Sequence, residues 1–165
     1  MNPLTERQIR ASFVNCSRGE AARLTLPADL DEVRWDRLDY YGWIDRKAPE
    51  RAYLVLTVDD TTVGISLRAP EVTTKRRRAV CAWCEDIYAT ADVSLYVARR
   101  AGASGRNGDT IGTLICTRFA CSTNVRRQPR IIEAGEDPEG VIRRRIDGLR
   151  ERSVLFAREV LREIA

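Results

Sequence analysis

The sequence predicts an α+β fold: a small antiparallel β-sheet with flanking helices, a module built on two pairs of cysteines, and a long C-terminal helix. Three observations predict this class. β-Branched residues gather in short segments between polar turns, four cysteines occur in two tight pairs, and the final segment repeats apolar residues at helical spacing. At 165 residues, 44% of them hydrophobic, the chain is long enough for one core, so we predict a single domain over residues 1–165.

Two short helices are predicted at the start of the chain. Thr5 begins a Thr-x-x-Gln capping box, after which apolar or small residues follow at helical spacing as far as Cys16. Ser17 and Glu20 repeat the capping signal, and Pro27 ends the second helix.

An aromatic segment follows these helices. Between residues 31 and 45 the apolar residues are mostly Trp35, Tyr40, Tyr41 and Trp43. Because Gly42 lies among them, we predict a compact turn or half-helix that packs on the sheet. Residues 1–50 are thus expected to supply two helices and an aromatic lid.

Four strands are predicted in two pairs. Residues 52–58 and 62–68 are rich in β-branched residues and are separated by a short polar turn, so segment 51–74 is predicted to be a β-hairpin. Residues 92–98 alternate apolar with small or polar side chains, and residues 110–116 are their predicted partner across a loop rich in Gly and Arg.

Segment 131–165 is predicted to contain a long amphipathic helix that begins at Asp137-Pro138. Its apolar stripe consists of Ile142, Ile146, Leu149, Ser153, Phe156, Val160 and Ile164. Packing of this stripe on the sheet is favoured over a dimer seam, because Gly148 and the polar Ser153 weaken a coiled coil.

The composition argues against an enzyme. Histidine is absent, which removes the commonest general base, the usual partner of a nucleophile and the usual ligand of catalytic zinc. We therefore expect neither catalysis nor a small-molecule substrate.

A cytoplasmic location is expected. No apolar run approaches the roughly 20 residues of a membrane-spanning helix, and the N-terminus lacks a signal-type apolar segment.

The chain has five cysteines, an odd number, and reducing compartments disfavour structural disulfides. Both facts favour a metal site over disulfide bonds.

The paired cysteines predict one structural zinc ion, held by Cys81, Cys84, Cys116 and Cys121. A Cys-x-x-Cys loop and a second pair 31 residues later can fill a tetrahedral shell, which leaves no open position for water. The first pair, the predicted hairpin and the helix that starts at the last cysteine together describe a treble clef within residues 75–130. The alternatives are a redox Cys-x-x-Cys motif or buried core thiols. For Cys16, core packing is expected.

Positive charge is concentrated in this module. Residues 75–130 hold eleven Lys or Arg against four acidic residues, a local charge of +7, although the whole chain carries only +4. The candidate partner-binding residues are Arg99, Arg100, Arg106, Arg118, Arg126 and Arg127. One basic face that pairs with carboxylates or phosphates is the functional interpretation, and a solvated surface without a partner is the alternative. The run Lys75 to Arg78 is expected to be an exposed connector.

Several ordered motifs carry a family resemblance. They are residues 9–16, 38–45 and 63–68, Cys81-Ala82-Trp83-Cys84, Arg99-Arg100-Ala101-Gly102, Gly105-Arg106, residues 112–116 and residues 120–126. In order and spacing the chain resembles the FBP-domain family, also described as the elongation factor G-binding protein C-terminal treble-clef zinc-finger family, which includes fusidic acid resistance proteins.

The resemblance implies a zinc-containing domain that binds translation elongation factor G and, in the resistance proteins, promotes release of the drug-stalled factor from the ribosome. A zinc-ribbon-like module that binds RNA or the ribosome directly is the alternative. Salt dependence separates the two, since binding dominated by phosphate contacts weakens steeply as salt rises.

Overall fold

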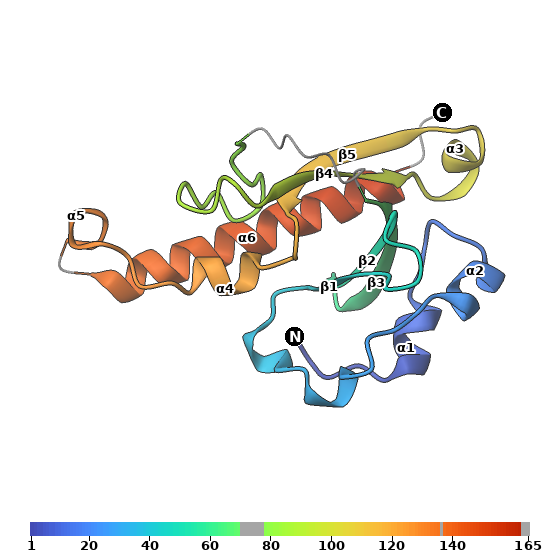
Figure 1. Ribbon diagram of the computed structural model, residues 1–165, viewed down its shortest axis with the longest axis horizontal. Helices are drawn as coiled ribbons and strands as arrows, with labels where there is room; N and C mark the ends of the chain where they lie inside the picture. The colour runs from blue at the N-terminus through green and yellow to red at the C-terminus, as the bar shows by residue number, and fades with distance from the viewer. Residues whose placement is uncertain (70–77, 136, 163–165) are drawn as a thin grey trace.

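The computed structural model describes residues 1–69, 78–135 and 137–162, and it contains one five-stranded antiparallel sheet (Figure 1). The strands follow one another in chain order: β1 (Tyr41–Ile44), β2 (Arg51–Val58), β3 (Thr61–Arg68), β4 (Val93–Arg99) and β5 (Thr110–Cys116). The helices are α1 (Glu6–Ala11), α2 (Arg18–Arg23), α3 (Gly102–Arg106), α4 (Cys121–Val125), α5 (Ile131–Ala134) and α6 (Pro138–Leu161). Two 3₁₀ turns, Leu30–Glu32 and Trp35–Arg37, precede β1. The predicted α+β class is confirmed.

The prediction of a compact turn or half-helix over residues 31–45 is wrong for its final part, because Tyr41–Ile44 forms the edge strand β1 and pairs with β2. Gly42 suggested a turn, but the structure gives it another role. A Cβ atom at this position would lie 2.5 Å from Cγ of Phe119, so glycine allows the second cysteine loop to pack against the strand. Tyr41 and Trp43 are buried on the opposite face of the sheet.

Both faces of the first three strands are covered, which explains the continuous apolar run at the centre of β2. One face packs against α1, α2 and the aromatic residues of the N-terminal segment, and the other packs against α6. The β2–β3 connection is a two-residue turn, in which Asp59 and Asp60 both adopt positive φ angles, 45° and 64°. This turn geometry matches the twist of paired strands.

Both predicted capping boxes are present at the starts of α1 and α2. The first helix is shorter than its sequence spacing suggested, because it ends at Ala11. The Ser12 hydroxyl donates to the Ile9 carbonyl at 2.7 Å, and the chain then pairs with Gly64 of β3 through Phe13. Cys16 therefore lies beyond the helix and is half buried.

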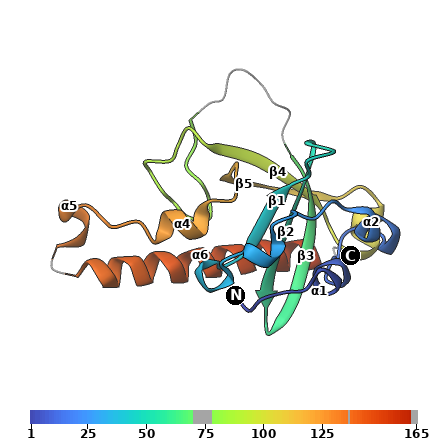
Figure 2. The same cartoon turned by 60° about the horizontal axis from the view of Figure 1, so that its bottom comes forward.

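The sheet has a short central junction. β3 and β4 are paired only at Leu67–Ala98 and Arg68–Val97. α6 crosses this junction and packs against β2, β3 and β5, as Figure 2 shows from a second direction. Asp137 caps α6 by accepting from the Gly140 amide at 2.8 Å, which confirms the predicted start of this helix.

The predicted loop between β4 and β5 contains the short helix α3, which differs from the prediction of an irregular loop. Gly102 starts it with φ of 66°, and Ser104 donates to Asp109 at 2.5 Å. Lys75, Arg76 and Arg77 lie outside the described residues. No helix within the described ranges has the length and hydrophobicity that a membrane crossing requires.

Candidate metal centre

The four predicted ligands lie together. The Sγ atoms of Cys81, Cys84, Cys116 and Cys121 are all within 4.8 Å of one another, and all four residues are buried. The Sγ–Sγ distances are 3.6 Å for Cys81–Cys121 and 3.6 Å for Cys84–Cys116. These distances are too long for disulfide bonds.

The geometry fits a zinc ion. Four sulfurs at 2.3 Å from a tetrahedral centre are separated by about 3.8 Å, close to both observed distances. Four thiolates form a closed shell with no position for water, so the zinc is structural. The metal would supply a rigid cross-link between the two cysteine loops.

The local backbone presents the sulfurs. Cys81 and Cys84 belong to a tight turn in which the amides of Trp83 and Cys84 both point to the Cys81 Sγ, at 3.4 Å each. Hydrogen bonds from the neighbouring thiols and from the Cys84 amide hold the pKa of Cys81 far below its usual range, and the thiol of Cys116 has the largest effect. Thiolate is the form that binds metal.

The second loop connects β5 with α4. Cys116 ends the strand, Cys121 begins the helix, and Phe119 between them has φ of 58°. The two loops are also tied by backbone, because the Ala82 amide donates to the Leu114 carbonyl at 2.8 Å. Hairpin, loops and helix form the predicted treble clef.

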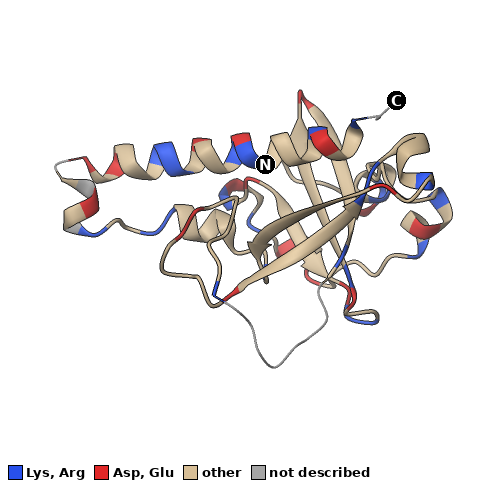
Figure 3. Ribbon diagram, turned by 90° about the horizontal axis from the view of Figure 1, so that it is seen from above, with Lys and Arg blue, Asp and Glu red and all other residues tan. Residues whose placement is uncertain are grey.

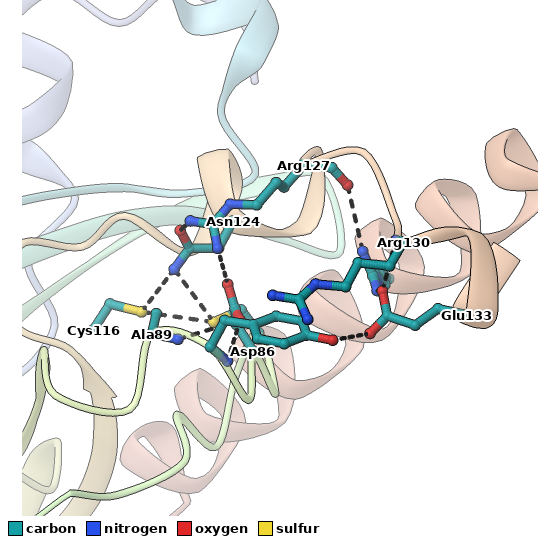
Figure 4. Close-up of polar contacts among 10 residues, drawn as sticks. Asp86, Ala89, Cys116, Asn124, Arg127, Arg130 and Glu133 are labelled. Carbon is teal, nitrogen blue, oxygen red and sulfur yellow. Dashed lines mark hydrogen bonds and ion pairs between the residues drawn. The ribbon is translucent and has the colours of Figure 1, made fainter.

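A polar chain runs from the sulfurs to the surface (Figure 4). The Asn124 side-chain amide donates to Cys116 Sγ at 3.3 Å and lies 3.8 Å from Cys84 Sγ. Arg127 donates to the Asn124 oxygen and to Asp86, both at 3.0 Å. Asp86 in turn accepts from the backbone amides of the loop that follows the first cysteine pair. α4 and this loop are thereby connected beside the metal centre.

Aromatic residues surround the centre on its inner side. The Trp83 ring lies between the rings of Tyr40 and Phe156, with centroid distances of 5.0 and 5.6 Å. Arg152 of α6 donates to the Trp83 carbonyl at 2.8 Å, so the last helix docks directly on the first cysteine loop. Burial, followed by the charge of nearby Cys121, raises the pKa of Tyr40 well above its usual range.

Cys16 packs against the core on the α1 and α2 side of the sheet, away from the metal centre. Burial raises the pKa of its thiol to about 11. It is therefore protonated at neutral pH, as expected for a packing residue.

The six candidate arginines are not brought together as one face. Two of the six, Arg100 and Arg126, form ion pairs within the protein. Arg126 forms a two-point ion pair with the fully buried carboxylate of Asp39, at 2.5 and 3.2 Å, and Arg150 binds the same carboxylate at 2.9 Å. Arg100 donates to the Glu159 carbonyl, and only 11% of its side chain is exposed.

The other four arginines are exposed but lie at two ends of β4 and β5. Arg99 and Arg106 are beside α3, whereas Arg118 and Arg127 are beside the cysteines. The strands hold these ends about 20 Å apart, given seven paired residues at ~3.3 Å each. Figure 3 shows Lys and Arg distributed along the molecule with Asp and Glu between them.

An exposed apolar surface beside the metal centre was missed from the sequence. We call it the knuckle surface and define it as Ile87, Tyr88, Arg127 and Arg130, which line one cavity. The exposed fractions of its apolar residues are 62% for Ile87 and 46% for Tyr88. In the sequence, this surface corresponds to isolated large apolar residues in otherwise polar segments. These residues do not recur at helix or strand spacing.

This surface is internally ordered. The Arg130 guanidinium stacks 4.3 Å from the Tyr88 ring centre, and the Tyr88 hydroxyl donates to Glu133 of α5 at 2.9 Å. Arg145 of α6 pairs with the same carboxylate at 3.3 Å. A cavity of about 280 Å³ lies among these residues and Cys84. Figure 4 shows Arg130 and Glu133 next to one another.

Comparisons with a family model and with solved structures find similar proteins. Residues 8–160 match the family model described as FBP C-terminal treble-clef zinc-finger. Among solved structures, the chain is similar to the fusidic acid resistance protein FusC, with 24% sequence identity and a TM-score of 0.48. That similarity covers 62% of this chain and 45% of FusC, so the chain spans less than half the length of that protein. A search of curated proteins finds no match.

Proposed function

The chain belongs to the FBP C-terminal treble-clef zinc-finger family, and from this premise we propose that it is a zinc-containing protein that binds translation elongation factor G. The observation that carries the proposal is the family match over residues 8–160, which includes the whole metal centre and the helix that docks on it. Promotion of the factor's release from the ribosome is the further activity that this family suggests for the chain.

The knuckle surface is the site that we propose for the factor. Aromatic and arginine side chains dominate the binding energy of protein interfaces, and exposed apolar residues beside them are characteristic of such sites. Tyr88 and Arg130 are already held in place by their mutual stacking and by Glu133, which reduces the entropy lost on binding. Among the described residues, the Arg130 guanidinium forms no ion pair, because Glu133 accepts from the Arg130 backbone amide instead, so a carboxylate of the factor suits this guanidinium.

The test is calorimetry of the full chain with purified elongation factor G. Tyr88→Ala and Arg130→Ala are each expected to weaken binding by about 2 kcal/mol, or roughly 30-fold, if they lie at the centre of the interface. Arg106→Ala, at the far end of β4 and β5, is the matched control and should bind as wild type. Unchanged binding by both knuckle variants would contradict this site.

Binding of ribosomal RNA is a second candidate function, favoured by the exposed arginines Arg99 and Arg106 beside α3. Neither has an ion-pair partner among the described residues. Labelled RNA that binds with a steep, log-linear loss of affinity in salt, and that is weakened by Arg99→Ala or Arg106→Ala, would support this candidate. Binding of elongation factor G without such RNA binding would exclude it as the main role.

We also propose that the protein has no catalytic turnover. The closed four-cysteine shell offers no position for an activated water, and the chain supplies no histidine base. Turnover that persists through purification and disappears with a single substitution in this chain would refute the proposal.

A further inference from the structure

The zinc centre carries more negative charge than its ion neutralises. Four thiolates around Zn²⁺ leave a net charge of −2, and the four cysteines are between 0% and 5% exposed. A buried charge is costly unless hydrogen-bond donors surround it. The sulfurs therefore need donors from this chain.

Three of the four sulfurs have a hydrogen-bond donor. Cys81 accepts from two backbone amides at 3.4 Å, and Asn124 approaches both Cys116 and Cys84. Cys121 differs: among the hydrogen bonds that meet distance and angle criteria in the described part of the chain, the one at its sulfur is shared with the Cys81 sulfur, at 3.6 Å. Two metal-bound thiolates have no proton to share, so this contact supplies no donor to Cys121.

One buried donor near the two cysteine loops is without a partner. The Tyr40 hydroxyl is the only buried side-chain oxygen or nitrogen in the described ranges without a hydrogen-bond partner. The Tyr40 side chain is 1% exposed and packs edge-on against Trp83 and Phe119, one from each cysteine loop. Tyr40 and all four cysteines belong to one buried cluster.

We propose that Tyr40 completes the zinc site as a positioning residue, with its hydroxyl donating a hydrogen bond to the Cys121 thiolate. This assignment satisfies the unpaired hydroxyl and gives the fourth sulfur a donor. It also links the N-terminal segment to the metal, because the preceding residue, Asp39, binds Arg126 at the end of the helix that Cys121 begins.

If Tyr40 only fills space in the core, its substitution should have the opposite effect. If the hydroxyl were merely an unpaired group in the core, Tyr40→Phe would leave zinc affinity unchanged and would keep or raise stability, because it removes an unsatisfied polar atom. If it donates to Cys121, the same change removes a stabilising contact from the thiolate. Loss of such outer-shell partners typically weakens metal binding by about 10- to 100-fold.

The experiment compares Tyr40→Phe with wild type in competition with a chromophoric zinc chelator, using the full chain. Asn124→Leu, which removes an observed sulfur donor, calibrates the size of the effect. Tyr53→Phe is the matched control, because its hydroxyl is also buried but donates to Asp45 in the other core cluster. Circular dichroism checks that each variant is folded.

We expect Tyr40→Phe to lose zinc affinity by about 10- to 100-fold, as Asn124→Leu does, and Tyr53→Phe to lose none. In the cobalt-substituted protein, the sulfur-to-cobalt charge-transfer band should move to lower energy in Tyr40→Phe, because a thiolate without a donor is easier to oxidise. Wild-type zinc affinity in folded Tyr40→Phe overturns the proposal, whether or not its stability changes.

Discussion

At the scale of single residues, the buried carboxylate of Asp39 shows that some arginines form ion pairs within the fold instead of contacting a partner. Its two oxygens bind Arg126, at the C-terminal end of α4, and Arg150 of α6, which are 87 and 111 residues away in sequence. One carboxylate thus fastens the N-terminal segment to both helices that flank the metal centre. Arginines held in this way are not available to a partner.

Removal of this carboxylate should be strongly destabilising. Asp39→Asn leaves Arg126, whose side chain is 19% exposed, without its ion pair. We expect a loss of about 3 kcal/mol in the free energy of unfolding, at the lower end for a broken buried pair because Arg150 can reach water. Urea denaturation measures the free energy of unfolding of the variant and of wild type. Asp36→Asn, which removes an exposed carboxylate that pairs with Arg34, should unfold as wild type.

The raised pKa of Cys16 predicts its reactivity. Only the thiolate reacts with alkylating reagents, and burial raises the pKa of this thiol from 9.0 to about 11. In the zinc-loaded protein, alkylation of Cys16 should therefore be slow at pH 7 and should accelerate as pH rises toward 11. Mass spectrometry of timed reactions locates the label. Rapid modification of Cys16 below pH 8 in folded protein would contradict this prediction.

Sequence patterns were informative about residues whose chemistry is local. The cysteine spacing identified all four sulfurs that the structure gathers, and the capping boxes marked two helix starts. The partners of Arg100 and Arg126 were not predictable, because each is chosen by tertiary contacts with a distant residue. The same limit applies to Tyr40, whose place against Trp83 and Phe119 depends on how the N-terminal segment packs.

At the scale of elements, periodicity predicted the strands and the long helix better than their ends. β1 was missed because Gly42 usually indicates a turn, whereas here it permits close contact with Phe119 from a loop nearly eighty residues later. α1 was overextended because Phe13 continues the apolar spacing but pairs with β3 instead. In both cases a tertiary contact overrode the local signal.

Docking of α6 on the first cysteine loop should be a major source of stability. Phe156 is 7% exposed and contacts Trp83, so Phe156→Ala should lower the free energy of unfolding by about 3–5 kcal/mol through lost burial and a cavity. Its neighbour Leu155 is 51% exposed and provides the control, since Leu155→Ala should change stability by about 0.5 kcal/mol or less. Equal effects of the two substitutions in denaturant titrations would show that α6 does not pack this way.

At the scale of the whole molecule, zinc joins parts that the sheet joins weakly. β3 and β4 share two residue pairs, whereas the metal centre contacts Tyr40 from the N-terminal segment, α4, and α6 through Trp83. The centre therefore lies where the two halves of the structure meet, and its integrity should affect both.

Zinc removal should consequently destabilise the entire fold. We expect a strong chelator to lower the thermal midpoint markedly and to abolish near-ultraviolet circular dichroism from Trp83, because metal-binding energy is largely folding energy in small modules. Cys81→Ser should behave like the metal-free protein, and Cys16→Ser should retain a transition close to that of wild type. An unchanged midpoint in protein shown by elemental analysis to lack metal would refute this.

The position of α6 has a consequence for biosynthesis. A ribosome makes a chain from its N-terminus, so the sheet and the cysteine loops are synthesised before the helix that covers them. Until Phe156 and Val160 emerge, one face of β2 and β3 and the ring of Trp83 have no cover on that side. A nascent chain halted before α6 would expose this apolar surface to chaperones, and native folding would wait for the last helix to leave the exit tunnel.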